Sequence, residues 1–191
     1  MSTEFIIGLS VMLILALITV IIYNGIITRM NSVERAWSDV ITQERQKNKI
    51  IPHLEKLVSE YKEFEQGLLT KITELRSALS RLSGDTIDSA SLSQAESKTQ
   101  DLLKGINIAV ENYPDLKASE GFNNLMREIS EQQENIGAAI RIFNKNVEDF
   151  NNGIQVFPNS LVNSLFNKKV KIEAFKDSEA SAGFEYRPNI H

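Results

Sequence analysis

The sequence predicts an all-α protein in which an N-terminal transmembrane helix precedes an antiparallel up-and-down helical bundle. Three observations support this fold class. Residues 5–27 form a run without a charge, apolar residues after it recur at spacings of three and four, and no segment alternates apolar and polar residues for long. We expect a short segment at 1–4, a transmembrane helix at 5–27, a bundle over 28–166 and a polar, disordered tail over 167–191.

The uncharged run is long enough to cross a bilayer. At about 1.5 Å per residue, a helix over 5–27 extends roughly 34 Å, against a hydrocarbon core of about 30 Å. A cleaved signal peptide is the main alternative, and it would carry a basic start and a small-residue cleavage site. Residues 1–4 contain no Lys or Arg, and the run ends in Ile26-Ile27, so we expect an uncleaved anchor that contacts the lipid bilayer through residues 5–27.

The distribution of Lys and Arg predicts the orientation of the anchor. None precedes the run, whereas five follow it within about 22 residues: Arg29, Arg35, Arg45, Lys47 and Lys49. The bias puts the N-terminus outside and the bundle in the cytoplasm, although neighbouring acidic residues such as Glu34 and Asp39 dilute it.

The first apolar series of the bundle contains Val33, Trp37, Val40, Ile51, Leu54, Val58, Tyr61, Leu68, Ile72, Leu75, Leu79 and Leu82. Glu44, Lys47 and Asn48 occupy its one long gap, which predicts either a polar layer or an exposed stretch. Ser83-Gly84-Asp85 predicts the end of this series.

Two more helices are expected after that stop. One series contains Leu92, Ala95, Thr99, Leu102, Ile106, Ala109 and Tyr113; it ends at Pro114, and a capping box at Ser91 or Ser93 could begin it. The last series contains Phe122, Leu125, Ile129, Ile136, Ala139 or Ile140, Phe143, Val147, Phe150 and Ile154, and Pro158 ends it.

Pro52 leaves two topologies open. An interior proline costs a helix about 3 kcal/mol, whereas a proline in the first turn costs no hydrogen bond. If a new helix begins at Pro52, the bundle has four helices, and we favour this arrangement because it covers every apolar stripe. If the helix only kinks, residues 30–82 form one rod in a bundle of three long helices, and the stripe around Val33 and Trp37 lacks a partner.

The composition supplies little chemistry. A net charge of −4 excludes a nucleic-acid binder working by bulk charge, and the absence of cysteine excludes thiolate metal sites and cysteine nucleophiles. His53 has no partner at metal-ligand spacing, and no phosphate loop or nucleophile motif occurs. We therefore expect no enzyme activity, no cofactor, no metal and no small-molecule substrate.

The candidate interaction residues are Trp37, Leu161, Leu165 and Phe166. Trp37 is expected to be a core residue or an anchor between subunits. Residues 159–166 form a short amphipathic piece followed by Lys168, Lys169 and Lys171, and we favour a cap over the open end of the bundle. The alternative is a docking site for a partner or a membrane surface.

Several stretches resemble the LemA family. They are Tyr23-Asn24, Val33-x-x-Ala36-Trp37-Ser38, Ile51-Pro52-x-Leu54, Arg76-Ser77-Ala78, the run from Val110 to Ala118 around Tyr113-Pro114, Arg141-x-Phe143-Asn144-x-x-Val147, Phe150-Asn151 and Phe157-Pro158. The resemblance covers about residues 20–166 in order. It departs at His53, where the family usually has Asn, and at Phe143 and Phe150, where Tyr is usual.

The resemblance implies a bacterial inner-membrane protein with a single span, an outside N-terminus and a cytoplasmic helical bundle. It carries over no catalytic residue. Two functions remain open: a self-associating scaffold, which implies a homo-oligomer, or a tethered adaptor or regulatory subunit of another membrane complex, such as a protease or signalling system.

Overall fold

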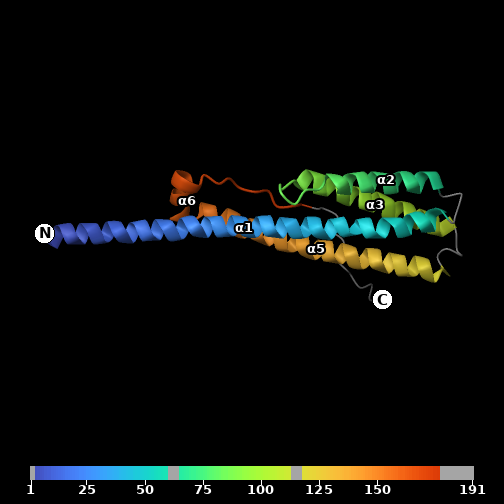
Figure 1. Ribbon diagram of the computed structural model, residues 1–191, viewed down its shortest axis with the longest axis horizontal. Helices are drawn as coiled ribbons and strands as arrows, with labels where there is room; N and C mark the ends of the chain where they lie inside the picture. The colour runs from blue at the N-terminus through green and yellow to red at the C-terminus, as the bar shows by residue number, and fades with distance from the viewer. Residues whose placement is uncertain (1–2, 60–64, 113–117, 177–191) are drawn as a thin grey trace, which may run out of the picture.

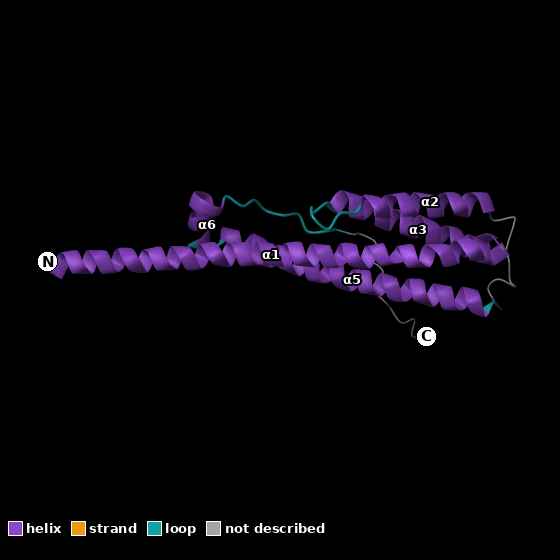
Figure 2. Ribbon diagram, viewed as in Figure 1, coloured by secondary structure: helices purple, strands orange, loops and turns teal. Residues whose placement is uncertain are grey.

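A computed structural model describes residues 3–59, 65–112 and 118–176 of the chain. Every regular element in these ranges is a helix, which confirms the all-α fold class (Figure 2). The elements are α1 (Thr3–Ser59), α2 (Glu65–Arg81), α3 (Ser89–Asn112), α5 (Glu120–Gln155), the single turn α6 (Asn159–Val162) and the short π-helix η2 (Asn163–Asn167).

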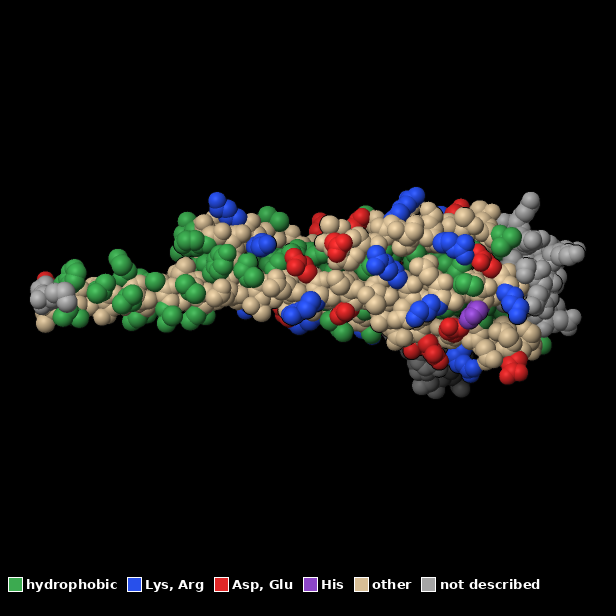
Figure 3. Space-filling model, in the orientation of Figure 1, with side chains coloured by type: hydrophobic (Ala, Val, Ile, Leu, Met, Phe, Trp, Pro, Cys, Tyr) green, Lys and Arg blue, Asp and Glu red, His purple; other side chains and the backbone are tan. Residues whose placement is uncertain are grey.

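Helix α1 joins the anchor to the bundle without a break. Its N-terminal part projects alone from the other helices, and its apolar side chains are exposed (Figures 1 and 3). By length and composition, this helix could cross a membrane. Beyond about residue 30, the same helix packs along α5 and α2 and lies in the bundle. The anchor and the bundle therefore share one backbone rod.

The four main helices run antiparallel, up and down, as expected (Figure 1). The reversal expected at Pro52 is wrong, because α1 continues through this proline to Ser59 and the chain reverses before α2 begins at Glu65. The single rod over 30–82 is wrong for the same reason. Pro52 is exposed, and Ile51 and Leu54 on either side of it are buried, so a continuous helix keeps both in the core. Their burial offsets the hydrogen bond that the proline removes.

The core lies where the apolar series of the four helices meet. Its largest fully buried side chains include Trp37, Ile51, Ile72, Leu92 and Phe143. Val33 and Trp37, which a three-helix arrangement would have left uncovered, pack inside the bundle. Helix α1 lies along α5 and α2, and α2 lies along α3.

The turn between α2 and α3 is held by side chains of α1. Trp37 Nε1 donates to the Ser83 carbonyl at 2.9 Å, Ser38 Oγ to the Gly84 carbonyl at 3.2 Å, and Arg45 Nη2 to the Leu82 carbonyl at 2.8 Å. These bonds satisfy carbonyls that the end of α2 leaves without helical partners.

The cap of α3 differs from the two capping boxes considered from the sequence. Asp88 Oδ1 accepts hydrogen bonds from the Ala90 and Ser91 amides at 3.1 and 3.0 Å, and Ser91 Oγ donates to Asp88 Oδ2 at 2.7 Å. These bonds lower the pKa of the Asp88 carboxyl below its ordinary value. Asp88 is therefore the N-terminal cap.

The chain turns back after η2. Lys168 adopts a left-handed backbone conformation, and residues 169–176 continue beside α5 without helix or strand, with Phe175 buried. This part of the tail was expected to be disordered, and that expectation is wrong, because side chains of α5 bind its backbone. Residues 177–191, the remainder of the expected tail, lie outside the described residues.

Candidate functional site

Trp37 is a core residue of the bundle. Its side chain is 1% exposed, its ring centroid lies 5.3 Å from that of Phe143 at an interplanar angle of 56°, and its Nε1 is bonded to the Ser83 carbonyl. Of the two roles expected from the sequence, the structure supports the core residue. As an interaction-surface residue Trp37 was misassigned, because α5 and the α2–α3 turn already cover it.

The other three predicted residues are on the surface. Leu161, Leu165 and Phe166 are 54%, 61% and 58% exposed, whereas Val162 between them is buried. Helix α6 and η2 rest on α1 near its exit from the apolar run, and Asn167 Nδ2 donates to the Tyr23 carbonyl at 3.4 Å. The piece thus covers this end of the α1–α5 pair through Val162, as expected of a cap, and presents a second apolar face outward.

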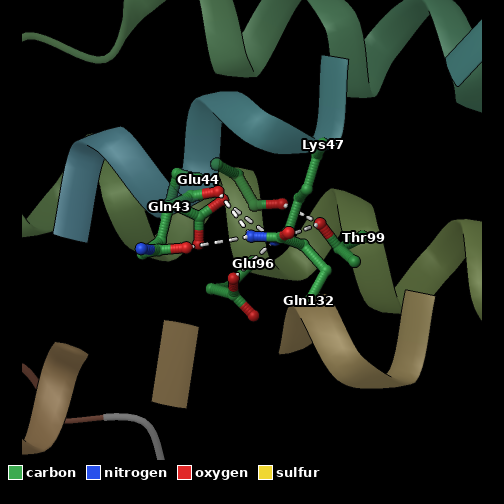
Figure 4. A network of polar contacts seen from close by, with 7 residues as sticks. Gln43, Glu44, Lys47, Glu96, Thr99 and Gln132 are labelled. Atoms are coloured by element: carbon green, nitrogen blue, oxygen red, sulfur yellow. Dashed lines mark hydrogen bonds and ion pairs between the residues drawn. The ribbon is translucent and has the colours of Figure 1, made fainter. Parts of the chain in front are cut away.

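The polar layer predicted for the gap in the first apolar series exists at two of its three residues. Glu44 and Lys47 of α1 are buried and face Glu96 and Thr99 of α3, while Asn48 is exposed (Figure 4). Lys47 Nζ lies 2.9 Å from Glu44 Oε2, 2.7 Å from Glu96 Oε1 and 3.0 Å from Thr99 Oγ1. The three N–H groups of the ammonium thus have three oxygen neighbours.

Two carboxyl groups share this one lysine. Burial raises the pKa of Glu44 well above its ordinary value, despite the opposing charge of Lys47. The pKa of Glu96 is lowered: its burial acts to raise it but is outweighed by hydrogen bonds from Glu44, Lys47 and Gln133 and by the Lys47 charge. With the pKa of Glu44 raised and that of Glu96 lowered, Glu44 is the carboxyl that takes up a proton first as the pH falls.

Both Glu44 oxygens are buried and lack a well-directed hydrogen bond, although the Lys47 ammonium is close to one of them. An ionised carboxylate in that position is costly, which agrees with the raised pKa of Glu44. Helix α5 closes this side of the cluster through Gln132, whose Nε2 donates to the Gln43 carbonyl at 2.9 Å (Figure 4).

The polar cluster has no space for a substrate. The adjoining cavity measures about 30 Å³ and is lined by Lys47, Thr99, Gln132 and apolar side chains. Ligand pockets are typically about 300–1,000 Å³. The arrangement can fix the register of α1, α3 and α5 and hold a proton, and it offers no room for a reacting molecule.

Metal-binding geometry is absent from the part of the chain that the structure describes, where no group of three or more His, Cys, Asp or Glu side chains is suited to hold a metal ion. His53 is exposed, and its Nδ1 lies 3.8 Å from Glu128 Oε2. This pair is on the solvent side of the bundle.

Sequence reasoning found only half of the polar cluster. Glu44 and Lys47 interrupt an apolar series on their own helix, which is a visible signal. Glu96 lies 49 residues from Lys47, beside Ala95 and Thr99 of a different series, and no pattern in one helix indicates which residue of another will face it. The usable signal would have been a pair of opposite charges, Lys47 and Glu96, that each lie within the apolar series of a different helix.

Comparison with known proteins gives two consistent findings. The sequence model of the LemA family matches residues 36–190. Protein LemA of Metamycoplasma hominis is 31% identical over 134 residues, which are 70% of this chain and 60% of that protein. The chain therefore spans about 60% of the length of this relative.

Proposed function

Because this chain belongs to the LemA family, we propose that it is a non-enzymatic scaffold, anchored in the bacterial inner membrane by α1, that self-associates through its helical bundle. The N-terminus lies outside and the bundle lies in the cytoplasm. The exposed apolar part of α1 supports the anchored part of this proposal.

The observation that carries the scaffold role is the continuity of α1. Residues 3–59 form one helix, so no flexible linker separates the membrane span from the bundle. Because the bundle is fixed to its anchor in this way, every copy in the membrane has the same bundle faces directed toward its neighbours in the membrane plane. Anchoring in two dimensions also removes much of the translational and rotational freedom that association would otherwise cost.

The contact between copies must use faces that remain exposed, since Trp37 is covered within its own chain. Ile142 on the outer side of α5 is 59% exposed and is one candidate.

The mass of the full-length protein in mild detergent, measured by light scattering with particle imaging, tests this proposal. We expect a uniform assembly whose protein mass is a multiple of the 21.5 kDa chain. A matched variant with residues 5–21 scrambled, which preserves the length and composition of the span, should assemble equally. A monomeric wild-type protein would overturn self-association.

Loss of assembly on scrambling 5–21 alone would overturn the role given to the bundle. If the protein is monomeric and a crosslinked membrane protein is recovered with it in a fixed ratio, the tethered adaptor or regulatory subunit becomes the better description. Such a partner would dock on the sides of the bundle.

A further inference from the structure

We infer that a surface built by α6, η2 and the residues around them docks on the bilayer face from which α1 emerges, with its apolar side chains among the acyl chains and its lysines at anionic phospholipid headgroups. This α6 surface consists of Phe157, Leu161, Leu165, Phe166, Lys168, Lys169, Val170 and Lys171. The inference rests on the membrane anchor in the proposed function and does not depend on self-association.

The position of α6 along α1 is the first step. Asn167 is bonded to the carbonyl of Tyr23, and Ile26 is fully buried although it belongs to the uncharged run. A span over 5–27 places Tyr23 and Ile26 at its end, in the headgroup layer. Whatever packs beside these residues lies at the same depth, and α6 and η2 are packed there (Figure 1).

The chemistry of the outward face is the second step. Phe157, Leu161, Leu165, Phe166 and Val170 are 83%, 54%, 61%, 58% and 78% exposed. In Figure 3, hydrophobic side chains continue from the projecting part of α1 onto this region. Exposed apolar side chains gathered in this way mark a binding surface. Val162 packs against the bundle, whereas the other apolar side chains of this segment are exposed.

Charge is the third step. Between Asp149 and Glu173 the chain contains no acidic residue, while Lys168, Lys169 and Lys171 are all present. On α1, no acidic residue occurs between Glu4 and Glu34, and Arg29 lies at the exit. The exit of α1 and the α6 surface therefore carry only positive charge, while Asp149 on α5 lines a pocket together with Arg29. A lysine near an anionic membrane surface is attracted to the phospholipid headgroups.

These steps favour the bilayer over a protein partner as the occupant of the α6 surface. The bilayer is already present at the depth of Tyr23 once α1 is inserted, so docking costs no further association entropy. The pattern of apolar side chains flanked by lysines is that of an interfacial segment. A second membrane contact beside the span would fix the tilt and rotation of α1.

Tryptophan fluorescence in nanodiscs tests the inference with the full chain. The protein has a single tryptophan, Trp37, which is buried in the bundle and serves as the reference signal. Phe166→Trp adds a reporter on the α6 surface, and Ile142→Trp adds a matched exposed reporter on α5. In nanodiscs of phosphatidylcholine and phosphatidylglycerol with brominated acyl chains, we expect at least about twofold stronger quenching of the added signal in F166W than in I142W.

Equal quenching in F166W and I142W would overturn docking, whatever the mass of the assembly. If F166W loses its helical circular dichroism, Leu161→Trp takes its place with the same expectation. The lysine role has its own outcome: replacing Lys168, Lys169 and Lys171 by Gln should reduce quenching in the anionic nanodiscs, and quenching that is unchanged would overturn it.

Discussion

Lys47 is the residue on which the interior of the bundle depends most directly. Its ammonium lies between the Glu44 and Glu96 carboxyl groups and donates a hydrogen bond to the Thr99 hydroxyl. The Thr99 hydroxyl in turn donates to the Ala95 carbonyl. Buried ion pairs are weak evidence for stability as a whole, since both charges lose their hydration. Removing one partner, however, leaves the other charge buried without compensation.

Replacing Lys47 by Met should therefore destabilise the bundle strongly. The change keeps the apolar stem and deletes the charge, leaving Glu96 unpaired, and losses of this kind amount to about 3–5 kcal/mol. The urea midpoint of the full-length protein in detergent, followed by circular dichroism, measures the effect. Lys98→Met is the matched control: Lys98 pairs with Glu74 at 2.7 Å on the surface, and only a small shift is expected there. Equal shifts in the two variants would contradict this assignment.

The raised pKa of Glu44 gives the stability of the fold a dependence on pH. Because the folded-state pKa of Glu44 is raised, the unfolded chain loses this proton at a lower pH than the folded chain does. The contribution of Glu44 is thus fully present below its ordinary value of 4.5 and is lost as pH rises through the folded pKa. Glu96 acts in the opposite sense: its folded pKa is lowered, so its contribution is present above 4.5 and is lost as pH falls through the folded value.

Glu44→Gln should cancel the first of these effects. The amide keeps a donor toward Glu96 and does not titrate, so the variant mimics the protonated state at every pH. We expect the melting temperature of E44Q relative to wild type to rise steadily from pH 4.5 upward. Thermal unfolding across this range measures the difference, in which other titrating groups cancel. A difference that does not change with pH would mean that Glu44 is ionised in the fold.

At the scale of elements, asparagines hold the extended segment after η2. Asn144 Nδ2 donates to the Phe175 carbonyl and its Oδ1 accepts from the Phe175 amide, both at 2.8 Å. Asn151 does the same with Ile172, at 2.8 and 3.0 Å. Seven residues of helix rise about 10.5 Å, and three residues of extended chain span about 10 Å. The two distances match, so two asparagines on one face of α5 can supply the backbone of this segment with the hydrogen bonds that a neighbouring strand would otherwise give.

Asn144→Ala should release this segment without unfolding the bundle. Two neutral hydrogen bonds contribute about 1 kcal/mol each, so the Phe175 amide should exchange with solvent at least about tenfold faster. Hydrogen exchange with mass spectrometry measures this in peptides covering 168–176. Asn146→Ala is the control on the same helix, because Asn146 bonds only the Ile142 carbonyl of its own helix at 2.8 Å among the contacts described. Unchanged exchange in N144A would show that burial of Phe175 suffices.

The helices were largely predictable because each carries its own periodic signal, whereas contacts between elements were not. The series from Val33 to Leu82 falls on α1 and α2, the series ending at Ile154 corresponds to α5, and the stop at Ser83 is correct. The reversal predicted at Pro52 was wrong because the sequence shows only the hydrogen bond that a proline removes from a helix. The burial of Ile51 and Leu54, which offsets this loss, depends on contacts with other helices. The tail misled because its polar composition hides the fact that Asn144 and Asn151 supply its hydrogen bonds.

At the scale of the whole molecule, folding brings positive charge to the exit of the span. Sequence alone placed Arg29 there, and the return of the chain through α6 and η2 adds Lys168, Lys169 and Lys171, which follow Arg29 by 139 to 142 residues. The tendency of Lys and Arg to remain in the cytoplasm depends on charge close to the ends of a span. In the folded chain these three lysines add positive charge at the end of the span where Glu34 and Asp39 dilute it in the sequence.

The orientation can be measured directly because the chain contains no cysteine. Single cysteines at Thr3, before the span, and at Glu131, exposed on α5, give two reporters in otherwise unreactive protein. With a membrane-impermeant maleimide, we expect Thr3→Cys to be labelled in intact spheroplasts and Glu131→Cys only after permeabilisation, because moving the arginines and lysines at the exit across the membrane is the costlier alternative. Both variants must react fully in detergent, which controls for access. The reverse labelling pattern would place the bundle outside the cell, and the positive charge around α6 would then face the outer leaflet.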